Sequence, residues 1–165
     1  MTRPLLELNN LRFAWPKQPV LLDIDHFALA PGERLFLKGP SGSGKTTLLG
    51  LLGGVHLPQE GEVTLLGQSL NALSARQRDR FRAEHSGYIF QMFNLLPYLS
   101  VQDNVLLPCR FSQQRKQRAE QRHGSLSAAA THLLQGLGLT DPALLNRPAT
   151  TLSIGQQQRV AAARA

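Results

Sequence analysis

The stretch GPSGSGKT, residues 39–46, constrains the fold of this chain more than any other part of its sequence. It fits the pattern G-x-x-x-x-G-K-[ST]. It follows a short apolar run at residues 35–37, which predicts a strand buried on both faces. It precedes a leucine-rich stretch, residues 46–53, which predicts a helix. The order strand, glycine-rich loop and helix therefore predicts a site for a nucleoside triphosphate.

The chemistry of this phosphate loop follows from its residue types. Glycines let backbone N–H groups turn inward around phosphate oxygens, and a helix N-terminus adds the positive end of its dipole. The Lys45 ammonium should reach the β- and γ-phosphates, and the Thr46 hydroxyl should bind Mg²⁺. The residues expected to contact the nucleotide here are Gly39, Pro40, Ser41, Gly42, Ser43, Gly44, Lys45, Thr46 and Thr47. The loop alone does not distinguish kinases, GTPases and ATPases.

Composition is that of a folded domain. The chain has 165 residues, 42% of them hydrophobic and 18% charged, which excludes a disordered chain. The net charge of +7 would suit nucleic acid or an anionic membrane, but the basic residues between positions 110 and 122 favour a solvated surface, and no nucleic-acid role is predicted. Cys109 is the only cysteine, so an internal disulfide is excluded.

Two further features concern membranes. The start of the chain lacks the apolar stretch of a signal peptide, and the longest apolar run, residues 47–55, is far shorter than the roughly 20 residues that span a bilayer. We therefore expect a soluble chain whose membrane association, if any, comes through a partner.

The apolar pattern changes along the chain. Extended segments are predicted at residues 5–15, 21–30, 35–37, 61–67 and 87–91, and helices at residues 46–53, 76–84, 101–107 and 126–137. On the last of these, one apolar face is expected to comprise Leu126, Ala130, Leu133, Leu134 and Leu137. Residues 113–124 are either an exposed helix end or a loop. The predicted organisation is an α/β part (1–92), a helical part (93–151) and the start of a new helix (152–165).

Two later features, taken with the loop, carry a family resemblance. Gln91 ends a predicted strand, and LSIGQQQRV, residues 152–160, follows the helical part. In this order the sequence resembles the ATP-binding subunits of ATP-binding-cassette (ABC) transporters over essentially the whole chain. Residues 87–108 look most like the branch that serves lipoprotein release and macrolide-type efflux. The resemblance implies an α/β P-loop NTPase fold of the ABC nucleotide-binding type, with an antiparallel β portion and a helical subdomain.

The resemblance also implies roles for individual residues. Trp15 would stack on adenine, while Lys45 and Gln91 would be catalytic, with Gln91 contacting Mg²⁺ or the attacking water. Residues of the signature motif would complete the ATP site of a second, identical subunit arranged head to tail: Ser153, Gly155 and Gln156. A membrane permease would dock on the segment 93–98, here called the docking segment, through Phe93, Leu95, Leu96, Pro97 and Tyr98. The resemblance thus implies a cytoplasmic protein held at the inner face of the membrane by its permease.

The sequence departs from the family pattern in two places. Ile154 replaces the first glycine of LSGGQ; this weakens the site if a special backbone dihedral or a close approach to the phosphate is needed there, and changes little if the side chain points outward. The family continues with a strand ending in Asp-Glu (Walker B) and a later histidine, which these 165 residues do not contain. The resemblance therefore implies an incomplete domain that is unstable alone and hydrolyses ATP poorly or not at all.

Three alternative functions fit parts of the sequence. A vestigial, non-catalytic nucleotide-binding fragment would fit Ile154 and the missing acidic pair. A chromosome-maintenance or repair ATPase would need a long coiled coil between loop and signature, and the interval from Gln91 to Ser153 is too short for one. A nucleotide kinase would explain the phosphate loop, but it would not explain the LSIGQ motif.

Overall fold

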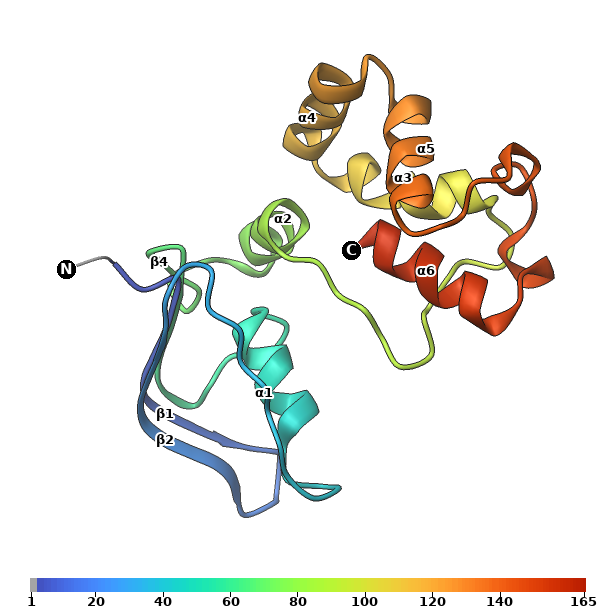
Figure 1. Ribbon diagram of the computed structural model, residues 1–165. Helices are drawn as coiled ribbons and strands as arrows, with labels where there is room; N and C mark the ends of the chain where they lie inside the picture. Colours follow the sequence, from blue (N-terminus) through green and yellow to red (C-terminus); the bar gives the residue numbers. More distant parts are fainter. Residues whose placement is uncertain (1–2) are drawn as a thin grey trace. The chain divides into compact units, whose positions relative to one another are not determined.

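The computed structural model describes residues 3–165, which form two compact units (Figure 1). The first unit ends at Arg82, within helix α2 (Ala75–His85), and the second comprises Ala83–Ala165. The ABC-type α/β fold predicted from the sequence is confirmed, with antiparallel strands in the first unit and helices in the second. The predicted boundaries after residues 92 and 151 stay predictions.

A four-stranded antiparallel sheet forms the framework of the first unit. Its strands are β1 (Leu6–Ala14), β2 (Val20–Leu29), β3 (Glu60–Leu65) and β4 (Gln68–Ser69), in the order β2-β1-β3-β4. The extended segments predicted at 5–15, 21–30 and 61–67 are therefore confirmed as β1, β2 and β3.

An irregularity in β1 sets which side chains reach the core. Asn10 has φ 48°, and the register with β3 shifts between Asn9 and Arg12. The buried side chains follow the same shift, since the alternation slips by one residue at this point. The buried residues of β1 are Leu6, Leu8, Leu11 and Phe13.

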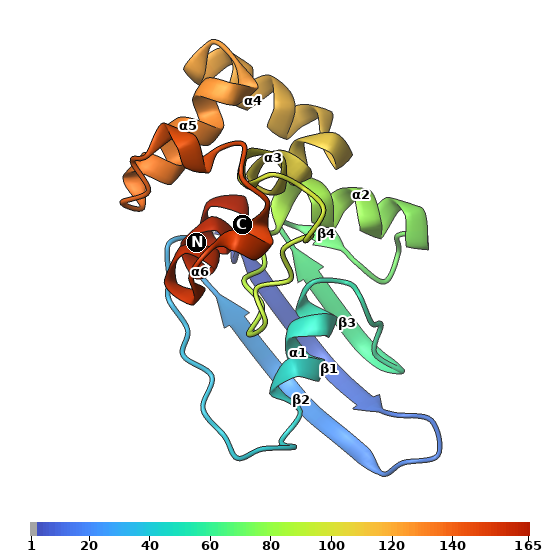
Figure 2. The same cartoon turned by 90° about the vertical axis from the view of Figure 1, so that its right-hand side faces the viewer.

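Helix α1 (Lys45–Leu52) packs on one face of this sheet, as Figure 2 shows. Leu51 is fully buried and belongs to the same apolar cluster as Leu8 of β1 and Val63 of β3. This burial fixes the axis of α1, and with it the position of the phosphate loop at the helix N-terminus.

The second unit is helical. It contains α3 (Val101–Phe111), α4 (Gln113–His123), α5 (Leu126–Gly136) and α6 (Ile154–Arg164), with short 3₁₀ turns at Pro142–Leu144 and Ala149–Thr151. Val105, Leu134 and Val160 bring α3, α5 and α6 into one core. The apolar face predicted on α5 is partly wrong: Ala130 and Leu134 are buried, whereas Leu133 and Leu137 are exposed because the core covers a narrower stripe.

The segment 113–124, left open between helix end and loop, is helix α4. The Ser112 hydroxyl caps its start by accepting from the Arg115 N–H at 3.1 Å. Gly124, at φ 78°, ends it in the left-handed conformation. Helix α3 is longer than predicted, because it continues past Pro108 to Phe111.

Two predicted strands are absent from the described residues. Residues 35–37 form no strand, and Leu35 and Phe36 are 53% and 86% exposed. Residues 87–91 form no strand either, and Ile89 is 60% exposed. The prediction of buried strands is wrong at both places, because a strand needs hydrogen-bonding neighbours and cover, and residues 3–165 supply neither to these segments.

Within residues 3–165, no helix combines the length and the apolar character that crossing a membrane requires.

Candidate functional site

The phosphate loop owes its shape to glycines. Gly42 and Gly44 have φ angles of 80° and 84°, which side chains with a Cβ rarely adopt. Gly44 is also the N-cap of α1, and a Cβ there would lie 3.1 Å from Leu22 and 3.2 Å from Leu21 of β2. The loop therefore lies tightly against the sheet where the first turn of α1 begins.

The Lys45 side chain folds back over this loop. Its Nζ donates to the carbonyl oxygens of Gly39 at 2.8 Å and Pro40 at 2.5 Å, and lies 3.3 Å from the Ser43 hydroxyl. These acceptors are neutral, whereas a phosphate oxygen is charged and accepts more strongly from an ammonium. The Lys45 ammonium is thus held at a position where it could bind an anion in the loop.

The N-terminus of α1 is suited to such an anion. No acidic side chain lies in its first turn, so the positive end of the helix dipole is not neutralised locally. Thr46, in that turn, is exposed. A phosphate-bound Mg²⁺ takes oxygen ligands, and the Thr46 hydroxyl offers one. The residues of the loop therefore fit the nucleotide and its metal ion.

Trp15 lies just beyond the end of β1 in the same unit. Its ring is half-buried and makes edge contacts with Phe13 (centroids 5.1 Å apart, 89° between planes) and His56 (5.1 Å, 78°). The Gln59 side chain pairs with both the N–H and the carbonyl of Ala14, at 2.9 and 2.6 Å, and steadies the strand end beside it. The stacking of this ring on adenine stays a prediction.

The signature motif forms the start of α6. Ser153 is the N-cap: its hydroxyl accepts from the Gln156 N–H at 3.3 Å, and the Gln156 side-chain oxygen accepts from the Ser153 N–H at 2.9 Å. This reciprocal capping box satisfies two backbone donors. Gly155 is exposed, with no atom within 4 Å of where a Cβ would lie. The motif thus presents an ordered helix N-terminus to solvent.

The structure answers the question of the backbone dihedral at Ile154; the effect of this residue on a partner's ATP stays open. The residue is the first of α6, has helical backbone geometry and is 75% exposed. No left-handed dihedral is required at this position, so the β-branched side chain is accommodated by pointing outward.

We predict that Ser153→Ala destabilises α6 by about 1 kcal/mol through loss of the cap. Ile154→Ala is the matched control on the neighbouring exposed position and should change the free energy of unfolding by less than about 0.5 kcal/mol. Urea unfolding followed by circular dichroism measures both. A larger loss for Ile154→Ala than for Ser153→Ala would contradict this role of the capping serine.

Gln91 lies in an exposed turn of the second unit, followed by the docking segment. Phe93 and Asn94 adopt positive φ angles of 58° and 49°. The structure brings together the loop and Trp15 in one unit, and Gln91, the docking segment and the signature motif in the other. Sequence reasoning missed Arg164 and Asn104, whose side chains bind backbone atoms of the segment after Gln91.

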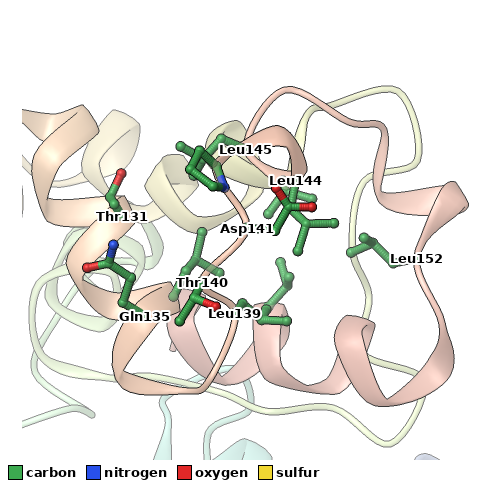
Figure 3. A pocket seen from close by; sticks show the side chains of 12 residues that line it. Thr131, Gln135, Leu139, Thr140, Asp141, Leu144, Leu145 and Leu152 are labelled. Atoms are coloured by element: carbon green, nitrogen blue, oxygen red, sulfur yellow. The ribbon is translucent and has the colours of Figure 1, made fainter.

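The second unit also contains a pocket that reaches Leu152, the residue before the capping Ser153. It is found between α5 and the chain that follows it, and Figure 3 shows Thr131 and Gln135 near its edge with Leu139, Leu144 and Leu152. It opens onto the apolar core of that unit and contains none of the predicted site residues. Across residues 3–165, no group of three His, Cys, Asp or Glu side chains is arranged to hold a metal ion.

Comparison with known sequences decides the family. A family model described as "ABC transporter" matches residues 22–165, which include the phosphate loop, Gln91 and the signature motif. The chain belongs to the ABC transporter family. The resemblance drawn from the sequence is thereby confirmed.

Named relatives narrow the branch of ABC proteins that this chain resembles. It is 41% identical over 166 residues to the lipoprotein-releasing system ATP-binding protein LolD of Pseudomonas syringae pv. tomato (strain ATCC BAA-871 / DC3000), covering 99% of this chain and 69% of that protein. It is 39% identical over 168 residues to the macrolide export ATP-binding/permease protein MacB of Burkholderia pseudomallei (strain 1710b), covering 100% of this chain and 24% of that protein. The chain thus spans about a quarter of the MacB protein.

Solved structures of ABC cassettes share the fold. The dimeric structure of MJ0796, a bacterial ABC transporter cassette, matches with a TM-score of 0.77 and 31% identity, covering 96% of this chain and 68% of that one. A post-hydrolysis state of MJ0796 bound to ADP and Pi, also dimeric, matches with a TM-score of 0.74 and 30% identity over the same shares.

Proposed function

We propose that the chain is the ATP-binding part of an ABC transporter that binds ATP with Mg²⁺ at the phosphate loop and, in the complete domain, hydrolyses it to drive a membrane permease. The observation that carries the proposal is the Lys45 ammonium, which lies over the loop carbonyls at the unneutralised N-terminus of α1 in an ABC family member. The named relatives belong to lipoprotein release and macrolide export, so we propose a transporter of that branch.

In this proposal the loop residues 39–47 surround the phosphates with backbone N–H groups. Lys45 would bind the β- and γ-phosphates, and the Thr46 hydroxyl would hold the metal ion, which when bound neutralises charge on the phosphates. Contact of Gln91 with the metal ion or the attacking water stays a prediction from the family resemblance. Trp15 stacks on the adenine. Each of these roles is consistent with where the residue lies in its own unit, at a helix N-terminus, in an exposed turn or at a strand end.

The second part of the proposal is a homodimer. Ser153, Gly155 and Gln156 would contact ATP held by the partner subunit, because they lie at an exposed helix N-terminus whose N–H groups suit a γ-phosphate. The dimeric structures of MJ0796 support this arrangement. The permease would dock on the docking segment, which would hold the complex at the cytoplasmic face of the membrane.

The test measures ATP turnover by the complete protein with its permease, and by the 165 residues alone. We expect Mg²⁺-dependent turnover in the first case. For the 165 residues we expect ATP binding with little turnover, because they contain no Asp-Glu pair after the signature helix to hold the metal and polarise water. Absence of turnover above background in the complete complex would contradict the transporter function and favour the non-catalytic alternative.

A further inference from the structure

The far end of the signature helix α6 binds the backbone of the docking segment. The Arg164 guanidinium donates through Nη1 to the Asn94 carbonyl at 2.5 Å and through Nη2 to the Phe93 carbonyl at 2.6 Å. Partial burial lowers the pKa of this guanidinium from its ordinary value, but an arginine side chain keeps its charge in proteins. Two short, charge-assisted hydrogen bonds therefore join α6 to two consecutive peptide groups.

The turn that Arg164 binds is conformationally costly. Phe93 and Asn94 both have φ in the left-handed region, at 58° and 49°. Asparagine tolerates this conformation, whereas phenylalanine rarely adopts it. Within the turn, the Phe93 N–H donates to the Phe90 carbonyl at 3.0 Å and the Asn94 N–H to the Met92 carbonyl at 2.6 Å. Such a turn persists when its surroundings stabilise it, and the guanidinium supplies that stabilisation.

The other end of the docking segment is fixed from α3. The fully buried Asn104 side chain accepts from the Leu96 N–H at 2.8 Å and donates to the carbonyls of Leu96 and Ser100, each at 3.0 Å. Tyr98, which lies between the Leu96 and Ser100 carbonyls that Asn104 binds, is 76% exposed. The backbone of the docking segment is therefore held from α6 at one end and from α3 at the other.

The docking segment and the signature region also share a hollow in the surface of the second unit. Leu95 and Pro97 line it from the docking segment, and Gln157 lines it from the first turns of α6. The Gln157 side chain donates to the Leu152 carbonyl at 3.0 Å, just before the capping serine. The first turns of α6 therefore adjoin the docking segment, and the last turn of α6 binds the backbone of that segment through Arg164.

We propose that Arg164 is a positioning residue that holds the left-handed turn at Phe93 and Asn94, so that the conformation of the docking segment follows the position of α6. The functional consequence of this role rests on the proposed function. If a permease binds the docking segment, a displacement of α6 at its signature end would change the conformation of that segment through Arg164. In this proposal Arg164 acts through the backbone carbonyls of Phe93 and Asn94 that it binds.

The test uses the complete protein with Arg164→Ala, Arg164→Lys and, as control, Arg118→Ala on the exposed surface of α4. In Arg164→Ala, hydrogen exchange at the Phe93 and Asn94 amides should accelerate by about tenfold or more, because the turn loses both carbonyl bonds. Permease-stimulated ATP hydrolysis should fall about tenfold in kcat, while KM for ATP and basal hydrolysis stay within about twofold. Arg118→Ala should match the unmodified protein in all of these.

Two further variants guard against a merely structural effect. Arg164→Lys keeps the charge but can bind one carbonyl well, so its exchange rates and stimulated turnover should lie between those of arginine and alanine. Phe93→Gly in the Arg164→Ala background removes the cost of the left-handed conformation at the residue that rarely adopts it, and should recover part of the lost protection at the Asn94 amide. Recovery would show that the turn, and not global unfolding, is what Arg164 controls.

The outcomes separate this inference from the proposed function. Unchanged exchange in both Arg164 variants overturns the positioning role. Faster exchange with unchanged stimulated turnover overturns its consequence for coupling. If the unmodified protein shows no ATP turnover at all, the proposed function fails, and the exchange measurement still decides whether Arg164 holds the turn.

Discussion

Lys45→Ala is expected to weaken ATP binding by at least about 100-fold, since the ammonium forms charge-assisted hydrogen bonds to phosphate oxygens that alanine cannot replace. Lys45 donates to the carbonyls of Gly39 and Pro40, so it already lies within the loop that would surround the phosphates. Binding then requires only an exchange of acceptors, from neutral carbonyls to charged phosphates. ATP turnover should be lost with the binding.

Isothermal titration calorimetry of the complete protein with ATP, in the presence of Mg²⁺, measures the affinity for ATP. Lys38→Ala is the control, because this exposed lysine lies just before the loop and carries the same charge. Its affinity for ATP should stay within about threefold, since exposed charges at a distance are screened by salt. Lys45→Arg should also bind weakly, because a planar guanidinium does not fit a site shaped for an ammonium. ATP binding by Lys45→Ala within about fivefold of the unmodified protein would contradict the assignment of the site.

Much of the local structure could be predicted from the sequence because its signals are local. Alternation of apolar residues predicted β1 and β2, and the glycine pattern together with its leucines predicted α1. Helix α4 was left open, although Ser112 before it and Gly124 after it are residue types that begin and end helices. Here the signal was present in the sequence and was outweighed by the polar character of the segment.

The failed strand predictions have a different cause. Residues 35–37 and 87–91 have the composition of buried strands, but strand formation depends on partners that composition does not specify. Helix α3 differs from its prediction in the opposite direction. It was predicted to end at residue 107, whereas it continues through Pro108 to Phe111, and the Ser112 N–H donates to the Pro108 carbonyl at 3.0 Å.

Some residues of the candidate site could be predicted from the sequence and others could not. The phosphate loop could be predicted from the residue types that its chemistry requires, and the signature motif from its resemblance to the family pattern. Arg164 and Asn104 could not, because both bind backbone carbonyls, and every residue of the chain offers one. Which carbonyl a side chain reaches is decided by the tertiary fold, and no spacing in the sequence records it.

Gly61→Ala is expected to destabilise the first unit severely. Gly61 lies in β3 at φ 81°, opposite the irregular part of β1 where Asn10 also has a positive φ. A Cβ at this position would overlap the backbone oxygen atoms of Asn9 and Asn10. Backbone atoms in a paired strand cannot move aside as a flexible side chain can, so β1 and β3 would have to separate locally.

The expected loss is about 3 kcal/mol or more in the free energy of unfolding of the first unit, which combines an unfavourable dihedral with steric overlap. The consequence reaches the phosphate loop, because Gly44 packs against Leu21 and Leu22 of β2, and β2 is held in the sheet by β1. ATP affinity should therefore fall together with stability, although Gly61 lies outside the loop.

Gly32→Ala separates the two contributions. Gly32 belongs to the same unit and has φ 79°, but no atom lies within 4 Å of where its Cβ would be. The Gly32→Ala variant should lose only the free energy that the unfavourable dihedral costs, about 1–2 kcal/mol. Urea unfolding of both variants, with and without ATP, gives the comparison. Equal losses of unfolding free energy in Gly61→Ala and Gly32→Ala would contradict this prediction. They would mean that the paired strands β1 and β3 can accommodate a methyl group, and that their close approach does not determine the stability of the first unit.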